Sequence, residues 1–145
     1  MNLPVPIPGL VIRYSYLRHS EHLQGREEGV KDRPCAVVLV TETDAGGELV
    51  TVLPVMHTPP ANANLALEIP STVKQRLNLD GERSWIVFAE MNRFVWPGPD
   101  LHPLPGRDIS TIAYGVLPPK FFEHLKARLL QTARARRTRT VPRTD

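Results

Sequence analysis

Proline limits the fold of this chain more than any other feature, since 15 of the 145 residues are prolines. They are scattered along the sequence and form no repeat. Proline fixes its own φ angle, lacks an amide hydrogen and restricts the residue before it. Regular structure is therefore confined to short segments between fixed turns, which favours small strands over long helices.

The length corresponds to one ordinary domain, and the 41% hydrophobic and 23% charged residues are usual for a soluble globular protein. A membrane-spanning helix needs about 18 uninterrupted apolar residues, and no stretch of the chain approaches that length. Met1–Leu10 has no basic region ahead of its apolar residues, unlike a secretory signal. The single cysteine, Cys35, excludes an intramolecular disulfide. We therefore expect a cytoplasmic protein without a membrane partner.

Apolar runs bounded by turn residues predict several short strands and two helices. Strands are expected over residues 10–17, 35–41, 49–55, 65–69 and 84–89, with a hairpin turn over 44–47. A brief helix is expected over 71–77 with Ser71 as its N-cap, and a final helix begins at Pro118. This pattern fits a mainly β protein, a small barrel with a helix packed on it, although it does not by itself select the barrel.

The C-terminal end is basic. The apolar pattern of the last helix stops near Ala133, and arginines dominate beyond it. We expect one domain over residues 1–132, followed by a basic, flexible tail over 133–145. The net charge of +3 is mild, but its concentration at this end favours a polyanionic partner.

The first candidate site is a charged segment, Gly25–Pro34, that leads into the predicted strand over 35–41. Arg33 lies where this loop meets the core, and Pro34 fixes the direction of the chain after it. A guanidinium on such a rigid boundary is suited to binding a phosphate through two hydrogen bonds. The alternative is a solvated charge run without a ligand.

The second candidate is Pro54–Thr58, at the end of a predicted strand. His57 could move a proton near neutral pH, although a lone histidine can equally be structural or merely exposed. The other four histidines do not have the spacing of a helical zinc motif, and one cysteine cannot build a thiolate site. We therefore expect no metal and no cofactor.

The third candidate is Glu90–Trp96, directly after a predicted strand. Arg93 could bind a phosphate, Asn92 could read a base edge, and an aromatic ring could stack on a base. The alternative is that Phe94 and Trp96 alternate into the core while Arg93 faces water.

In their order along the chain, these segments resemble the MazF/PemK family of toxin endoribonucleases. The resemblance covers roughly Pro8 to Leu130, and its most specific point is Arg33-Pro34 before a run of valines. Its other parts are Gly9-Leu10-Val11-Ile12, Gly25-Arg26-Glu27, the Pro-x-Thr type turn at Pro54–Thr58, and Glu90-Met91-Asn92-Arg93.

The resemblance implies an SH3-like barrel that forms a homodimer, binds a cognate antitoxin protein and cuts single-stranded RNA. Cleavage in this family needs no metal and proceeds by attack of the ribose 2′-hydroxyl on the adjacent phosphate. Arg33 matches the catalytic arginine and Glu90 the catalytic aspartate of the family. The implied catalytic residues are Arg33, His57, Thr58 and Glu90, and the implied RNA-binding residues are Arg26, Lys31, Asn92 and Arg93.

The sequence also departs from the family pattern. Met56 stands at the catalytic threonine position, which leaves His57 and Thr58 as the nearest substitutes, and Phe88 stands at the position of a second catalytic arginine. The helical segment over 71–77 and the loop over 97–106 are additions to the family core. Two alternatives to the nuclease therefore remain: a binding module for RNA or protein that has lost catalysis, and a CcdB-like inhibitor of a protein target.

Overall fold

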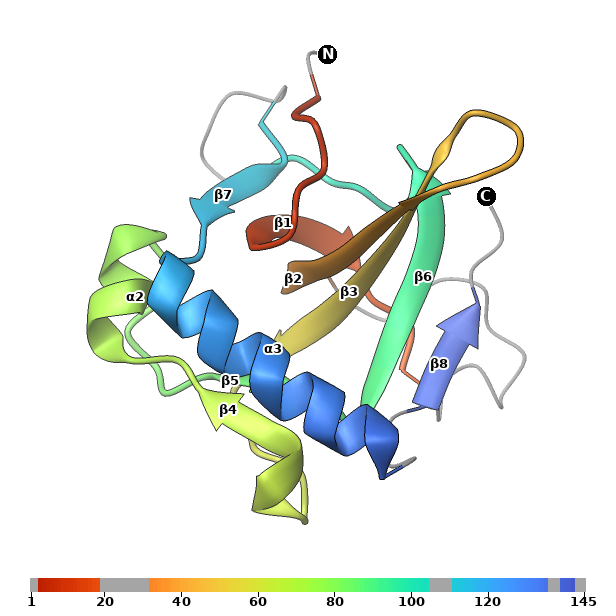
Figure 1. Ribbon diagram of the computed structural model, residues 1–145. Coiled ribbons are helices and arrows are strands. Elements are labelled where there is room, and N and C mark those ends of the chain that lie inside the picture. The colour runs from red at the N-terminus through yellow and green to blue at the C-terminus, as the bar shows by residue number, and fades with distance from the viewer. Residues whose placement is uncertain (1–2, 19–31, 105–110, 136–138, 143–145) are drawn as a thin grey trace.

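The computed structural model describes residues 3–18, 32–104, 111–135 and 139–142 (Figure 1). Over these residues the chain is mainly β, with eight strands in one largely antiparallel sheet and a helix near the C-terminus. The mainly β class and the C-terminal helix were both predicted and are confirmed. The sheet does not close into a barrel. No helix in the described part of the chain has the length and apolar character needed to cross a bilayer.

The sheet runs in the order β4-β5-β3-β2-β1-β7, and β6 joins it by pairing with β3 and β8. The strands are β1 (Leu10–Ser15), β2 (Asp32–Glu42), β3 (Glu48–Met56), β4 (Ala66–Glu68), β5 (Trp85–Val87), β6 (Glu90–Trp96), β7 (Ala113–Val116) and β8 (Arg139–Pro142). The helices are the 3-10 turn η1 (Ala63–Leu65), α2 (Ser71–Arg76) and α3 (Pro119–Arg134).

Strand β3 divides its pairing between two neighbours. Its first part, from Glu48 to Val52, pairs with β6, whereas Val55 and Met56 pair with β5. On its other side β3 pairs with β2 over most of its length. The end of β3 therefore pairs with β5 and not with β6, and the loop that follows Met56 begins beside β5.

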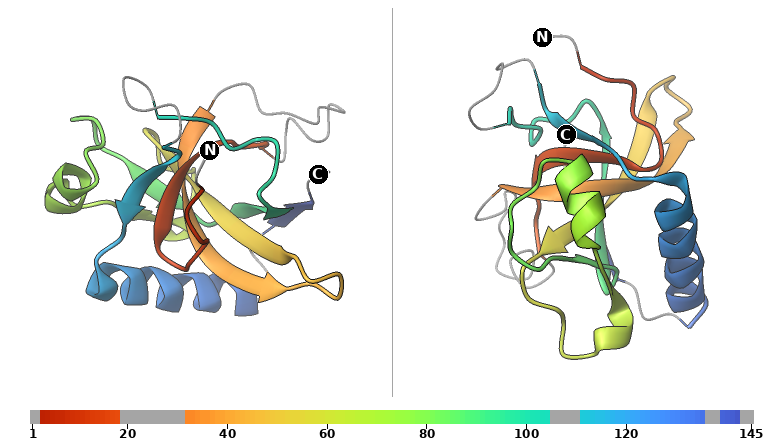
Figure 2. Two further views of the ribbon diagram at one scale, coloured as in Figure 1. Left: turned by 90° about the horizontal axis from the view of Figure 1, so that it is seen from above. Right: turned by 90° about the vertical axis from the view of Figure 1, so that its left-hand side faces the viewer.

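Alternating side chains supply a core on each face of the sheet, as expected for strands covered on both sides. Along β3, Leu53 and Val55 belong to a cluster that includes Leu125 of α3, while Val50 and Val52 belong to a second cluster with Phe94. Figure 2 shows α3 lying along one side of the sheet. The helix thus covers the first cluster with its apolar stripe, as the spacing of its residues predicted.

The predicted short helix is present as α2. Val73 and Leu77 are buried on the first core cluster, as their spacing indicated. The N-cap is Pro70 and makes no side-chain capping bond, so Ser71 is the first helical residue and the prediction of its capping role is wrong.

The prediction of a flexible tail over 133–145 needs correction. Residues Arg139–Pro142 form β8, which pairs in parallel with β6. Val141 is only 1% exposed. The end of the chain therefore contributes a buried side chain and a strand, in addition to its charge.

Candidate active site

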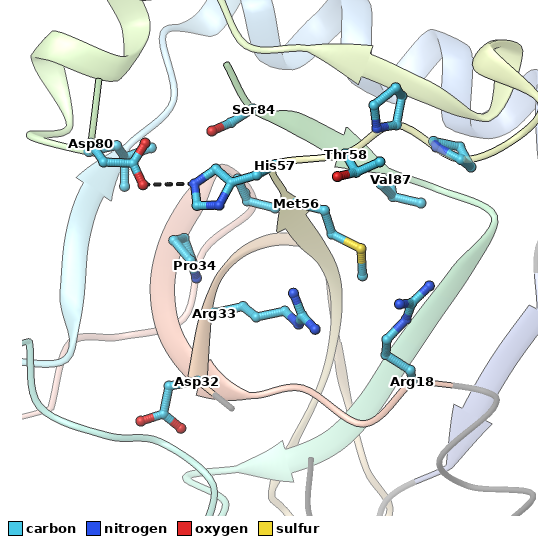
Figure 3. A pocket seen from close by; sticks show the side chains of 14 residues that line it. Arg18, Asp32, Arg33, Pro34, Met56, His57, Thr58, Asp80, Ser84 and Val87 are labelled. Carbon is cyan, nitrogen blue, oxygen red and sulfur yellow. Dashed lines mark hydrogen bonds and ion pairs between the residues drawn. The ribbon is translucent and has the colours of Figure 1, made fainter. Parts of the chain in front are cut away.

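A pocket of about 370 Å³ opens where β2 begins and β3 ends (Figure 3). Its walls come from the start of β2, the residues that follow β3, the loop after α2, and β5. Arg33, His57 and Thr58 all line it. Three of the four predicted catalytic residues, from segments more than twenty positions apart, are thus brought together.

Arg33 is the second residue of β2 and is held in register with Tyr14 of β1. Figure 3 shows its guanidinium reaching into the pocket, which Arg18 also lines. The Nε atom of Arg33 is buried and has no hydrogen-bond partner among the described residues. A buried donor left unpaired costs about 1–3 kcal/mol. An anion that accepted this hydrogen bond would remove the cost, so Arg33 is prepared for an anionic ligand.

His57 lies directly beyond β3 and contacts acidic side chains of the loop after α2. Its Nε2 is 2.7 Å from Oδ2 of Asp80 and 3.5 Å from Oε2 of Glu82. A carboxylate can only accept a hydrogen bond, so Nε2 carries a hydrogen and Nδ1 of the neutral ring is the basic nitrogen. The imidazole can therefore accept or return a proton through Nδ1.

Asp80 is held in place by Lys74, a helix α2 residue whose side chain is only 7% exposed. The Nζ atom of Lys74 lies 2.7 Å from Oδ1 of Asp80 and 2.7 Å from Oγ of Ser84, and it also donates to the carbonyl of Glu82. Burial acts to raise the pKa of Asp80, but hydrogen bonds from Lys74 and His57 outweigh it and lower that pKa below its usual value. The carboxylate facing His57 therefore stays ionised to lower pH than a free aspartate.

The two departures from the family pattern have different surroundings. Met56 is 9% exposed and lines the pocket, where its thioether offers no proton donor. Strand β3 ends at Met56, yet Thr58 still reaches the same pocket. Phe88 is fully buried in the core, and the guanidinium of Arg128 lies 5.5 Å from the centre of its ring. Phe88 therefore serves packing and is not available to a ligand.

Glu90 and Arg93 do not line this pocket, although both were predicted as site residues. Glu90 opens β6 opposite Arg139 of β8, and its charge contributes, after burial, to raising the pKa of Tyr16. The Nε atom of Arg93 donates a 3.4 Å hydrogen bond to Thr51 on the neighbouring strand. Arg26 and Lys31, the remaining predicted RNA contacts, lie outside the described residues.

The structure corrects the role predicted for Asn92. This side chain is fully buried, its Oδ1 accepts from the amide of Leu17 at 2.8 Å, and its Nδ2 donates to the carbonyl of Leu17 at 2.8 Å. An amide engaged in this way cannot read a base edge, so Asn92 joins β6 to the segment after β1. Phe94 belongs to the second core cluster, and Trp96 packs against that cluster. This confirms the alternative interpretation, in which these two aromatic residues point into the core.

One group of side chains in the described residues has the composition of a metal site. Ligand atoms of His57, Asp80 and Glu82 lie within 4.8 Å of one another, and all three residues are exposed. The ammonium of Lys74 already contacts Asp80, which disfavours a second cation at that carboxylate. The group is therefore better suited to orienting the imidazole than to holding a divalent ion.

Sequence reasoning missed Asp80, Lys74 and Ser84. Asp80 precedes Gly81 and was interpreted as the end of the short helix, and Lys74 carries no motif. The one available signal was that Lys74 follows the apolar Val73 on a short helix. A lysine buried there would need a partner, because lysine is rarely buried unless it is paired. No known protein family, curated protein or solved structure matches this chain.

Proposed function

We propose that this protein is a toxin-type endoribonuclease that cleaves single-stranded RNA without a metal ion, on a variant of the SH3-like barrel. One observation carries the proposal: the buried Nε of Arg33 has no partner among the described residues, in a pocket that His57 and Thr58 also line. The order of sequence segments that resembles the MazF/PemK family supports it. The short strands and the helix packed on one face are features that the open sheet shares with that barrel fold.

The proposed reaction is an internal phosphoryl transfer. The 2′-oxygen forms a bond to the adjacent phosphorus while the bond from phosphorus to the 5′-oxygen breaks, which leaves a 2′,3′-cyclic phosphate and a 5′-hydroxyl. Nδ1 of His57 takes the 2′-hydroxyl proton, and the leaving oxygen receives a proton from water. The imidazolium then returns its proton to the hydroxide, which restores both the neutral ring and the water. Arg33 binds the non-bridging oxygens, and its charge stabilises the transition state most where negative charge develops. The hydroxyl of Thr58 offers a further donor.

A second candidate function is RNA binding without cleavage on the same fold. Two observations favour it: Met56 places a thioether where the family has a catalytic hydroxyl, and Phe88 is fully buried. In this version Arg33 still holds a phosphate, but no group completes the proton transfers. The two candidates differ in whether new RNA ends appear.

The partners and setting follow from the resemblance and belong to the same proposal. The protein would act in the cytoplasm as a homodimer that a cognate antitoxin inhibits. A net charge of +3, concentrated in arginines near the C-terminus, favours either RNA or an acidic antitoxin segment at that end.

The decisive experiment is incubation of the purified protein with mixed single-stranded RNA in the presence of a chelator, with the new ends mapped. We expect 2′,3′-cyclic phosphate ends for the wild type, none for Arg33→Ala, and wild-type cleavage for Arg76→Ala, a matched change at an exposed arginine of α2. Binding that depends on Arg33 without new ends would favour the binding module. Neither binding nor cleavage would overturn both candidates.

A further inference from the structure

We propose that Asp80 is a positioning residue for His57, which makes the loop after α2 part of the active site. This inference rests on the proposed function, because it concerns the proton transfer assigned to His57. Asp80 lies three residues beyond the helical segment over 71–77, which is additional to the family core in the sequence comparison above. The structure nevertheless places its carboxylate within 2.7 Å of the imidazole.

The geometry gives the two ring nitrogens of His57 separate tasks. Nε2 donates to Oδ2 of Asp80, as the dashed line in Figure 3 marks. This bond fixes which nitrogen carries the hydrogen and limits rotation of the ring. Nδ1 has no hydrogen-bond partner among the residues that the structure describes, and Arg33 lines the same pocket. Asp80 thus leaves the basic nitrogen free for a substrate proton.

Asp80 is itself rigidly held, which a positioning residue requires. Its Oδ1 accepts from Nζ of Lys74 at 2.7 Å and from the backbone amide of Glu82 at 3.1 Å. Lys74 uses its other bonds on Ser84 and the Glu82 carbonyl, so it ties the loop to α2. The conformational entropy of the Asp80 side chain is therefore already lost on folding, and ligand binding does not have to order it. Lys74 therefore supports the carboxylate that contacts His57.

Charge supplies a second reason for the pair. Asp80 and Glu82 from the loop contact His57, and Lys74 of α2 contacts Asp80 in turn. Three further ionisable residues line the same pocket: Asp32, Arg33 and Arg18. The two guanidinium groups oppose a positive charge on the imidazole, whereas a carboxylate in direct contact favours it. Asp80 therefore opposes, at the ring itself, the effect of the two guanidinium groups on the imidazole.

The test compares Asp80→Asn with the wild type by two measurements. The titration of His57 is followed by NMR in protein without RNA, and the cleavage rate is followed against pH. Removal of the carboxylate should lower the midpoint of the His57 titration relative to the wild type, because the opposite charge in contact with the ring is lost. The rising limb of the rate profile should move to lower pH by the same amount. The plateau rate should fall by roughly tenfold or more. The loss should not exceed the about 10²–10⁴-fold that the whole proton transfer contributes.

Two further variants make the comparison specific. Glu68→Gln removes the same charge from β4, where the carboxylate is paired with Arg83, and should leave the His57 titration unchanged. Glu82→Gln should give a smaller shift than Asp80→Asn, because Glu82 lies 3.5 Å from the ring instead of 2.7 Å. A larger shift from Glu82→Gln, or none from Asp80→Asn, overturns the proposal.

The NMR titration separates this inference from the proposed function. If the wild type cuts no RNA, the nuclease proposal fails, and the titration alone decides whether Asp80 controls the ring. Should Asp80→Asn fail to fold, Asp80→Glu keeps a charge for Lys74 and displaces the carboxylate by one methylene. A folded Asp80→Glu protein with an unchanged rate and an unchanged His57 titration would overturn the inference.

Discussion

The side chain of Asn92 makes two hydrogen bonds of 2.8 Å to the backbone of a single residue, Leu17, which lies 75 positions earlier in the chain. One bond satisfies the amide of Leu17 and the other its carbonyl. Because Asn92 is fully buried, both bonds are shielded from solvent. This pairing fixes the segment that leads from β1 to Arg18 at the edge of the pocket.

The replacement Asn92→Ala should therefore destabilise the protein by roughly 2–5 kcal/mol, since it leaves two buried backbone groups unpaired. Asn92→Asp should cost more, because a carboxylate cannot donate to the Leu17 carbonyl and its charge would be buried. Urea unfolding of both variants measures these losses, with exposed Asn64→Ala as a control that changes little. A stable Asn92→Ala protein that lost RNA affinity would restore the base-reading role.

Arg33 should behave in the opposite way. Arg33→Ala should abolish cleavage while leaving the thermal midpoint unchanged or slightly higher, because the unpaired buried Nε disappears without breaking a bond to the described protein. Arg33→Lys should rescue poorly, since an ammonium lacks the planar pair of donors. Cleavage assays and thermal unfolding on the same samples test both statements. An unfolded Arg33→Ala protein would show that the arginine is structural.

Strand β8 should contribute to stability. Truncation after Ala135 removes the pairing with β6 and the buried Val141, so the free energy of unfolding should fall by about 2 kcal/mol or more. Thermal or urea unfolding measures the loss. Val141→Ala should reproduce part of it, and the exposed Thr140→Ala should not. An unchanged stability after truncation would mean that β8 does not hold its place on β6.

The charge of the same end can be tested separately from β8. The double substitution Arg136→Gln and Arg137→Gln keeps the strand residues while removing two positive charges. If both arginines contact RNA phosphates, the slope of log affinity against log salt should become shallower by about 1.4, since each contact to a single strand contributes about 0.7. Binding titrations at several salt concentrations measure this slope. An unchanged slope would assign these arginines to another partner or to solvation.

The lowered pKa of Asp80 makes part of the stability depend on pH. A carboxyl group whose folded pKa lies below its unfolded value of 3.8 stabilises the fold above that value, and the contribution is lost as the pH falls through the folded pKa. The wild type should therefore exceed Asp80→Asn in stability at pH 7, and the two should converge in acid below pH of about 3.8. Urea unfolding across this range measures the gap. Asp44→Asn, in the exposed hairpin turn, is the matched control, and a gap that persists in acid would contradict the assignment.

The strands with a continuous apolar run could be predicted because that signal is local. Strands β2 and β3 and the turn between them lie close to their expected ranges. Strand β6 was missed because Glu90–Trp96 was interpreted as a segment that follows a strand. Strands β7 and β8 were missed because each has only four residues, and neither shows a strand pattern of its own. Their backbone groups are satisfied by β1 and β6, which are far away in sequence.

The candidate site could be predicted where a residue sits at the end of a strand. Arg33 and His57 are such residues, and the sheet brings their strands together. Asp80 reaches His57 through a loop that Lys74 folds, and no local pattern encodes that contact. The motif over Glu90–Arg93 also did not show which side chains of β6 point inward. Phe94 was the available signal, because side chains two residues apart on a strand share a face and Phe94 is buried in the core.

The divided pairing of β3 has a mechanical consequence for the pocket. Arg33 is carried by the part of the sheet that contains β1 and β2, whereas His57 follows the end of β3 that turns to β5, with Asp80 in the loop before β5. An RNA whose phosphate contacts Arg33 and whose 2′-hydroxyl donates to His57 would connect these two walls. A bound ligand would then restrict the motion of β4, α2 and β5 relative to the larger sheet. It would add a second connection between these two parts, beside the continuous strand β3.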